Sequence, residues 1–423
     1  MSLILHHSAR LRYATAAMLY FAQGIPQGLL AIAMPAWLAS QGVEAGVIAS
    51  YLAIIVLPWA FKLVTGPLMD RYGFPPMGGR RPWILAAQFG MVLSLLGLTA
   101  IEDPVSQMSL LMALGALVNV FAATQDVAVD GMAIDLVPEQ EHGRINAFMI
   151  SGKAIGWAST SAASGILLVN YGLATTAVLS AVVAMLVWVV FLFVREREGE
   201  RLLPWSRGEH VPMQAAVSSF QDVKRGLNKV LWTRASLVIM VIMFLDGLIF
   251  GYGQALMPIA AIKVFNYSTE QWSQLVATMG LVGALLALLL GPIIDRIGVR
   301  QVLMLTVLVI AAHAMLLGNT QHLWNDSGFV QIMLSIWVLM SPVSMVCGIA
   351  LAMSICSSGV SATQFAIYMS VANLGHSAGS KLFGLVSDHA QLGYAAYFVS
   401  MSALVAVLFV AVALFRKQDA VSA

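Results

Sequence analysis

Several charged side chains occur in stretches of the sequence that are otherwise almost entirely apolar. A charge in such a stretch is costly to bury and is usually retained for function. Asp126 and Asp130 are four residues apart, which places both carboxyl groups on one face of a helix. Burial and mutual repulsion favour the protonated form of at least one acid in such a pair. This spacing predicts a site that takes up and releases a proton. The charges in apolar stretches are Lys62, Asp126, Asp130, Asp135, Lys153, Asp246 and Lys381.

Two further charges are expected at the depth of Asp126 in their own helices. Asp126 lies eleven residues before the end of its predicted helix at Val137, which is roughly 16 Å at 1.5 Å per residue. Lys153 and Asp246 lie ten and eleven residues after the start of theirs, or roughly 15 to 17 Å. We therefore predict that Asp126, Asp130 and Lys153 form a proton-coupling group. A purely structural ion pair between Lys153 and one carboxylate is the alternative.

Polar side chains in the same stretches are candidates for binding a solute. They could form hydrogen bonds with a sugar, an amide or a phosphate, although bonds between helices are the common alternative in membranes. Lys62 could bind an anionic group or neutralise one of the two acids, and Lys381 is expected to extend toward the membrane surface. The predicted substrate-binding residues are Gln23, Gln27, Lys62, Gln125, Asp246, Tyr368, Asn373 and His376, and Asn146 and Gln254 are further polar candidates.

The elements that position these residues are predicted to be membrane-spanning helices. The chain has 423 residues, of which 60% are apolar and 10% charged, whereas a soluble domain has about 25% charged residues. Each spanning helix needs about 20 apolar residues. Charges, prolines and glycines divide the sequence into twelve such segments, which predicts an all-α polytopic membrane protein. The segments are 13–38, 45–69, 83–101, 107–137, 143–169, 173–194, 235–261, 272–294, 301–317, 328–354, 361–387 and 393–415.

A long polar stretch at residues 195–233 separates the first six segments from the last six. It predicts two six-helix halves, 1–194 and 234–423, joined by a loop at 195–233. The termini and the loops on one side hold 18 of the 22 Lys and Arg residues, and such a side is cytoplasmic. A net charge of +2 without a basic run longer than two residues argues against a nucleic-acid partner. Because of the Lys and Arg bias, both termini and the middle loop are expected in the cytoplasm.

A short motif recurs in the two halves. Gly66-x-x-x-Asp70 and Gly291-x-x-x-Asp295 follow the second and eighth segments, at an offset of 225 residues. Ser151, Gly156 and Gly165 are matched by Ser370, Gly375 and Gly384 at an offset of 219. Two similar offsets indicate a duplicated six-helix unit.

The repeated motif is predicted to act as a conformational latch. Glycine permits close helix approach, and a carboxylate favours the N-terminus of a helix. Topology signalling by the arginines is the alternative. Asp135 lies near the cytoplasmic end of its segment and is expected to pair with Arg71, Arg81 or Arg144. The predicted latch residues are Gly66, Asp70, Arg71, Arg80, Arg81, Asp135, Gly291, Asp295, Arg296 and Arg300.

Twelve segments in two halves with this doubled motif resemble the major facilitator superfamily over essentially the whole chain. Four strings narrow the resemblance to the peptide and acetyl-coenzyme A transporter family, which contains AmpG-type muropeptide permeases, acetyl-CoA transporters and siderophore importers. The strings are Gln23-Gly24-Ile25-Pro26, the run Leu57-Pro58-Trp59-Ala60-Phe61-Lys62 leading to Gly66-Pro67-Leu68-Met69-Asp70-Arg71, Ala123-Thr124-Gln125-Asp126-Val127-Ala128-Val129-Asp130-Gly131, and Ser361-Ala362-Thr363-Gln364-Phe365-Ala366.

The resemblance implies a proton-coupled secondary transporter of the bacterial inner membrane that works by alternating access. The expected cargo is a polar, anionic solute of the muropeptide or amino-sugar conjugate class, imported by a monomer. A siderophore or acetyl-CoA-type transporter of the same family is one alternative, and a non-transporting membrane sensor or scaffold is another. The sequence has no phosphate-cradling loop, catalytic triad or metal-spaced cluster. We therefore expect no enzymatic activity, no metal site and no cofactor.

Overall fold

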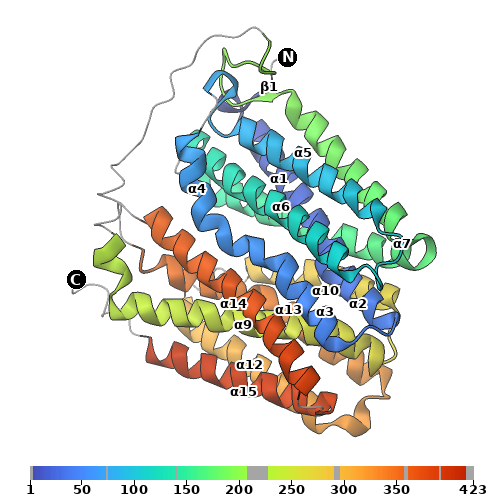
Figure 1. Cartoon of the computed structure of the whole chain (residues 1–423). Helices are drawn as coiled ribbons and strands as arrows, with labels where there is room; N and C mark the ends of the chain where they lie inside the picture. The colour runs from blue at the N-terminus through green and yellow to red at the C-terminus, as the bar shows by residue number, and fades with distance from the viewer. Residues whose placement is uncertain are drawn as a thin grey trace. The chain divides into compact units, whose positions relative to one another are not determined.

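The computed structural model describes residues 3–72, 75–138, 141–206, 227–289, 296–356, 361–389 and 392–415. Within these ranges almost every residue is helical, apart from a two-stranded parallel pairing of β1 (Leu3–Ile4) with β2 (Val194–Arg195). Nine of the described helices are long and apolar enough to cross a membrane. The fold is all-α, which confirms the predicted fold class (Figure 1).

The described helices correspond to the twelve predicted segments and are numbered as spans one to twelve in chain order. Span one combines α1 (Ala9–Pro26), the π-helical η2 (Gln27–Ala33) and α2 (Met34–Ser40), and span two combines α3 (Ala45–Val56), the 3-10 helix η3 (Leu57–Phe61) and α4 (Lys62–Arg71). Spans three to six are α5 (Arg81–Gly97), α6 (Met108–Leu136) and the two parts of α7 (His142–Leu192). The remaining spans are α9 (Arg234–Lys263), α10 (Thr269–Leu289), α12 (Val299–Asn319), α13 (Ser327–Met353), α14 (Ser361–His389) and α15 (Tyr394–Leu414).

Glycine and proline explain the irregular points in these spans. Gly172, with φ +76°, interrupts α7 between spans five and six, and a positive φ strains residues other than glycine. Pro26 lies at the end of α1 and precedes the π-helical turn. Pro58 lies in the first turn of the 3-10 segment within span two. Proline lacks the amide that a regular helix needs, so the helical pattern changes at both positions.

Contacts divide the chain into two compact units. The first comprises Met1–Met34 and Val64–Ala216, and the second comprises Pro35–Leu63 and Val217–Ala423. In the second unit α3 lies alongside α14 (Figure 1). There Ser377 donates to the carbonyl of Ala53 at 2.7 Å, and the Lys381 ammonium donates to Ser50 at 3.0 Å. The predicted boundaries of the two six-helix halves stay a prediction.

The two units repeat one helix-packing arrangement. In the first, a Cβ added to Gly24 would lie 2.7 Å from the backbone oxygen of Lys153. In the second, a Cβ added to Gly247 would lie 2.0 Å from the backbone oxygen of Ala372. The offset is 223 residues between the glycines and 219 between their partners. Glycine lets these backbones touch, so α1 packs on α7 as α9 packs on α14.

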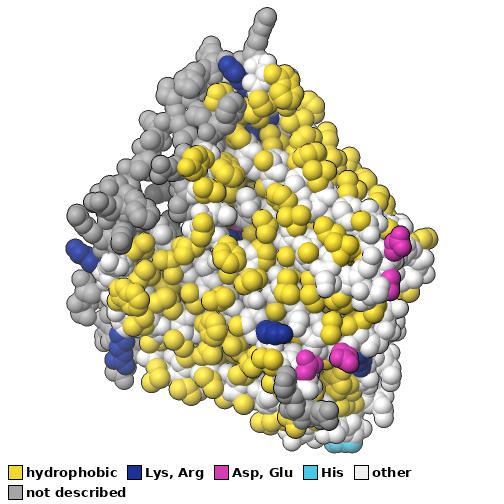
Figure 2. Space-filling model, viewed as in Figure 1, with side chains coloured by type: hydrophobic (Ala, Val, Ile, Leu, Met, Phe, Trp, Pro, Cys, Tyr) yellow, Lys and Arg dark blue, Asp and Glu magenta, His cyan; other side chains and the backbone are white. Residues whose placement is uncertain are grey.

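The surface of the molecule matches a lipid environment. Hydrophobic side chains are spread over the described part of the face in Figure 2, and Lys, Arg, Asp and Glu are sparse there. Long spans of this kind expose apolar side chains because lipid tails replace water around them. Leu186 and Val190, on the second part of α7, are 61% and 50% exposed, which is unusual for a soluble core helix but expected for a lipid-facing one.

Candidate functional site

The predicted acids and lysine meet a tyrosine in the first unit. The Lys153 ammonium on α7 lies 3.8 Å from Oδ1 of Asp126 on α6. Asp130, one turn along α6, accepts a hydrogen bond from the hydroxyl of Tyr20 on α1. The Lys153 ammonium also lies 5.9 Å from the centre of the Tyr20 ring. Three helices therefore bring two carboxylates, a cation and a phenol into one cluster, which we call the acid–lysine cluster.

Burial makes the charge of this cluster sensitive to its partners. Asp126 is 3% exposed, whereas the Lys153 side chain is 29% exposed. A buried carboxylate is costly without a cation and is stabilised by one nearby. The Lys153 ammonium therefore offsets part of the cost of burying the Asp126 carboxyl group, and the Tyr20 hydroxyl supplies a hydrogen bond to Asp130. Two acids with different partners can hold different numbers of protons as those partners move.

A chain of buried amides lies next to this cluster on α6. Gln125 donates to the side-chain oxygen of Gln88 at 3.2 Å and to the Leu19 carbonyl at 3.4 Å. Gln88 in turn donates to the carbonyl of Ala184 at 3.1 Å. Gln125 is fully buried and links spans one, three and four. These bonds between helices were the alternative to substrate contact at Gln125.

Gln23 on α1 is also fully buried. Its amide nitrogen and oxygen have no hydrogen-bond partner among the described residues. An unpaired buried amide is costly, and Gln23 lies one helical turn from Tyr20 on the same face. Gln27 is partly exposed, one further turn along. Gln23 and Gln27 therefore stay candidates for contacts that form in another state or with a solute.

The predicted binding residues of the second unit form separate contacts. Asp246 on α9 accepts a hydrogen bond from Ser344 on α13 at 2.6 Å. His376 on α14 shares a hydrogen bond with Gln254 on α9. Tyr368 is fully buried and its hydroxyl lies 2.7 Å from Ser236. The Tyr368 contact ties α14 to α9, so this tyrosine has the surroundings of a packing residue.

Lys62 and Asn373 both lie next to Trp59 in the second unit. The Lys62 ammonium lies 4.6 Å from the centre of the Trp59 ring, in a cation–π arrangement. Asn373 donates to the Trp59 carbonyl at 3.1 Å. Pro58, just before Trp59, belongs to the 3-10 segment in span two. The partly exposed ring and ammonium could bind an anionic or sugar-containing group.

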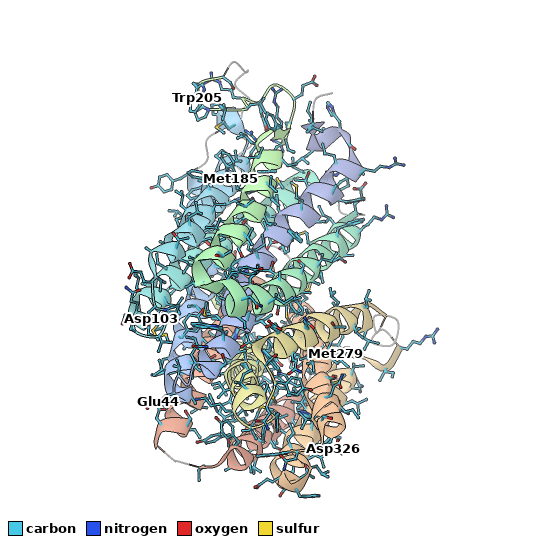
Figure 3. All side chains as sticks on the ribbon, turned by 90° about the vertical axis from the view of Figure 1, so that its right-hand side faces the viewer. Glu44, Asp103, Met185, Trp205, Met279 and Asp326 are labelled. Atoms are coloured by element: carbon cyan, nitrogen blue, oxygen red, sulfur yellow. The ribbon has the colours of Figure 1, made fainter. Side chains whose placement is uncertain are left out.

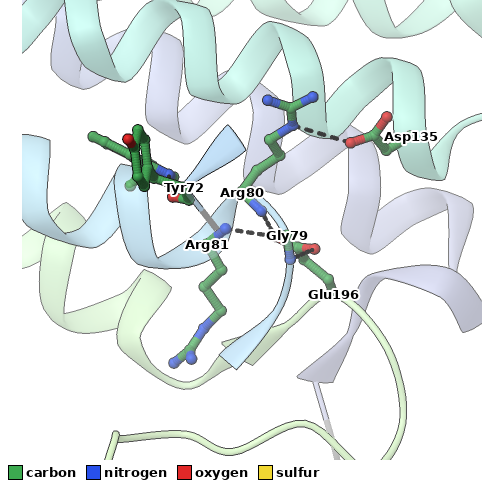
Figure 4. A network of polar contacts seen from close by, with 7 residues as sticks. Tyr72, Gly79, Arg80, Arg81, Asp135 and Glu196 are labelled. Carbon is green, nitrogen blue, oxygen red and sulfur yellow. Dashed lines mark hydrogen bonds and ion pairs between the residues drawn. The ribbon is translucent and has the colours of Figure 1, made fainter. Parts of the chain in front are cut away.

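The loop between spans two and three binds a glutamate that the sequence analysis did not single out (Figure 4). The Glu196 carboxylate accepts hydrogen bonds from the backbone nitrogens of Gly79, Arg80 and Arg81, at 2.9, 2.8 and 2.5 Å. Burial raises the pKa of Glu196 and outweighs these bonds. Burial and the nearby charge of Glu196 also raise the pKa of Glu200 to about 7. A glutamate at the start of a polar loop looks solvated, so no sequence signal marked it.

The arginines of the predicted latch have distinct contacts. Arg80 pairs with Asp135 at 3.1 Å. The Arg80 side chain lies beside Gly131, where an added Cβ would be 2.8 Å from the Arg80 Nε. Arg81 is fully buried and donates to the carbonyl of Leu192 at the end of α7. Asp135 therefore pairs with Arg80, which was not among the three expected partners.

The second copy of the motif repeats the Arg81 contact. Arg300 donates to the carbonyls of Val412 and Ala413 at the end of α15, at 3.1 and 2.5 Å. A cation at a helix C-terminus satisfies carbonyls that lack helical partners. Arg296 is exposed. The side chains of Asp70 and Arg71, and residues Gly291 and Asp295, lie outside the described residues. A Cβ added to Gly66 would lie 3.9 Å from Val127.

The N-terminal segment joins the same end of the first unit. Arg12 pairs with Glu141 at 2.7 Å and donates to the carbonyls of Leu5 and His6. The hydrogen bond from Arg12 lowers the pKa of Glu141. Within this unit Trp205 lies at the opposite end of the spans from Asp103 (Figure 3). The N-terminus and the start of the middle loop therefore lie on one side, as the even number of spans between them requires.

Comparisons with known proteins agree with this fold. The family model of the Major Facilitator Superfamily matches residues 16–380. The anhydromuropeptide permease of Escherichia coli (strain K12) is 24% identical over 376 residues, which are 86% of this chain and 72% of that protein. A putative transporter, AmpG 4 of Rickettsia felis, is 25% identical over 180 residues, 41% of this chain and 43% of that one.

A solved structure shows the same architecture. The crystal structure of the nucleoside transporter NupG has a TM-score of 0.70 and 11% sequence identity, and the alignment covers 96% of this chain and 99% of that one. At this identity the likeness concerns the fold alone. The family match extends over most of the chain, and it includes the helices that carry the acid–lysine cluster. This chain is a multi-pass membrane transporter and not an enzyme, and it belongs to the major facilitator superfamily.

Proposed function

We propose that the protein is a proton-coupled secondary transporter that imports a polar, anionic solute by alternating access. The observation that carries this proposal is the acid–lysine cluster of Tyr20, Asp126, Asp130 and Lys153. A buried carboxylate that exchanges one partner for a proton can couple proton entry to a rearrangement of helices. Such a change needs only the contacts of three packed helices to shift.

The cluster suggests a specific division of labour. Lys153 would hold Asp126 ionised while they are 3.8 Å apart. When α7 moves relative to α6, Asp126 would lose its cation and take up a proton instead. Tyr20 would keep Asp130 ionised through its hydrogen bond. The protonated cluster would then carry less charge through the membrane interior, which lowers the cost of the conformational change.

The proposed cargo is a muropeptide or amino-sugar conjugate. The relationship to an anhydromuropeptide permease supports this class at 24% identity. Lys62 above the Trp59 ring offers a cation and an aromatic face, which together suit a sugar acid. A siderophore would use the same aromatic and polar groups and is the second candidate within the family.

The proposed latch is the loop at residues 79–81 together with Asp135 and Glu196. Three backbone nitrogens bound to Glu196 fix this loop against the start of the middle loop. Arg80 fixes it to the cytoplasmic end of α6 through Asp135. Breaking these contacts would be part of the transition between conformations.

We further propose that the protein lies in the bacterial inner membrane with both termini in the cytoplasm, as a monomer. The bias of Lys and Arg toward one set of loops supports this orientation. A unique cysteine placed at residues 195–233 should resist an impermeant thiol reagent in intact cells. A cysteine replacing Asp103, in an opposite loop, should react and serves as the control. Labelling of the middle loop would overturn the orientation.

The substrate is tested with purified protein in two steps. Thermal shifts with an anhydro-muropeptide, acetyl-CoA and a ferric siderophore identify the class that stabilises the protein. Counterflow of that labelled compound in proteoliposomes then tests transport. We expect stabilisation and counterflow with the muropeptide alone. Stabilisation by the siderophore alone would move the protein to the second candidate, and binding without counterflow would favour a sensor.

A further inference from the structure

The repeated packing of the two units defines equivalent residues. Gly24 contacts the backbone at Lys153 and Trp157, and Gly247 contacts the backbone at Ala372 and His376. The same offsets place Gly156 beside Phe21 and Gly375 beside Phe244. Ala372 therefore occupies in the second unit the place that Lys153 occupies in the first. The cation of the acid–lysine cluster has no counterpart at this position.

The second unit nevertheless contains an acid one residue before Gly247, the glycine that packs on Ala372. Asp246 precedes Gly247 on α9, as Gln23 precedes Gly24 on α1. Its Oδ1 accepts a hydrogen bond from Ser344 at 2.6 Å. Its Oδ2 faces Gly348, where an added Cβ would lie 3.7 Å away. The side chain is partly exposed, so one carboxylate oxygen is fixed and the other lies beside a residue without a side chain.

Asp246 has no cationic partner in the described part of the chain. Among the described residues, Ser344 donates a hydrogen bond to Asp246, and no lysine or arginine forms an ion pair with its carboxylate. A carboxylate in a membrane interior without a cation is costly. In the first unit Lys153 offsets this cost for Asp126 at 3.8 Å. In the second unit the residue at the equivalent position is Ala372, which has a methyl group in place of the cation.

We propose that Asp246 is a binding site for a primary ammonium group of the transported solute. An ammonium is a compact charge with three donors, and Oδ2 and the Ser344 oxygen are acceptors that it could use. This inference rests on the proposed role as a solute transporter, and it adds a requirement to the cargo. The solute carries an amine as well as the acidic groups proposed above.

The missing cation can be tested without any ligand. Ala372→Lys supplies a cation at the equivalent position, and Ala372→Met is a control of similar length without charge. With Asp246 present, Ala372→Lys should melt about 2–4 °C above Ala372→Met. In the Asp246→Asn background the difference should vanish, because the double-mutant cycle isolates the interaction between the two side chains. If Ala372→Lys and Ala372→Met melt at the same temperature in both backgrounds, Asp246 does not respond to a cation at this position, and the proposal is overturned.

The ammonium itself is tested with glucosamine and N-acetylglucosamine, which differ in the charge of one nitrogen. The unmodified protein should bind glucosamine at least about tenfold more tightly. Asp246→Asn and Ala372→Lys should abolish this preference, and Ser344→Ala should reduce it while the charge remains. Equal binding of the two sugars, binding of neither, or a preference that survives Asp246→Asn would overturn the proposal. Because no muropeptide is used, this result is separate from the test of the proposed cargo.

Discussion

Replacing Glu196 with alanine should destabilise the end of the first unit that holds the N-terminal segment. Glu196 is 4% exposed, and its carboxylate accepts three backbone hydrogen bonds from Gly79, Arg80 and Arg81. These nitrogens lie at the start of α5, where helical amides have no partner within the helix. Glu196→Ala therefore removes the acceptor for all three at once.

The expected size of this effect follows from those three bonds. Loss of one capping acceptor costs about 0.5–2 kcal/mol. The loss of three bonds would cost more than this, but two effects reduce the total free energy. Burial already disfavours the ionised carboxylate, because it raises the pKa of Glu196, and water can replace part of the lost hydrogen bonding. We expect about 2–4 kcal/mol, which corresponds to a decrease in melting temperature of about 5–15 °C. Glu196→Gln keeps one acceptor oxygen and should lose about half as much.

The assay is thermal unfolding of purified protein, with Glu198→Ala as the matched control. Glu198 lies two residues away, and its side chain is 80% exposed. Its replacement should change the melting temperature by less than about 1–2 °C, because exposed charges contribute little. If Glu196→Ala and Glu198→Ala melt alike, the carboxylate does not hold the loop, and the reasoning is wrong.

Three further changes give separate tests. Burial raises the pKa of Glu200 in the folded protein to about 7, from its ordinary 4.5. The folded state therefore keeps a proton that the unfolded state releases, and stability should fall as pH rises between these values. Glu200→Gln should remove about 1–2 kcal/mol of that fall in melts at pH 5 and pH 8; an unchanged slope would contradict this. Gly24→Ala should cost at least about 2 kcal/mol in thermal unfolding, because its Cβ would lie 2.4 Å from the Trp157 nitrogen, whereas Gly393→Ala, with nothing within 4 Å, should not. Tyr20→Phe removes the hydrogen bond to Asp130 and should slow gradient-driven transport by about two- to tenfold; an unchanged rate would rule out a role for the hydroxyl.

Regular helix geometry explains which parts of the site could be predicted. Asp126 and Lys153 were placed at one depth by counting 1.5 Å per residue, and the structure brings them to 3.8 Å. The duplication was visible in the glycine spacing because close helix packing allows few other residues. Gly172, where α7 is interrupted, falls between predicted segments five and six.

Other contacts depend on tertiary structure that spacing does not encode. Tyr20 resembles any packing aromatic in an apolar span, yet its hydroxyl reaches Asp130 on another helix. Its position three residues before Gln23, on one polar face, was the signal available. Glu196 lies in a polar loop, and only the folded chain shows its three backbone partners. Asp135 pairs with Arg80, which the sequence did not single out as its partner, because loop geometry decides which guanidinium reaches it.

Proton coupling at the acid–lysine cluster is tested most directly by transport measurements on Asp126→Asn and Asp130→Asn in proteoliposomes, with and without a pH gradient. We predict that asparagine at Asp126 abolishes gradient-driven accumulation but leaves energy-independent exchange measurable, because a neutral amide mimics the protonated acid. A structural ion pair with Lys153 would instead impair both processes equally. Normal gradient-driven accumulation in both variants would contradict the account.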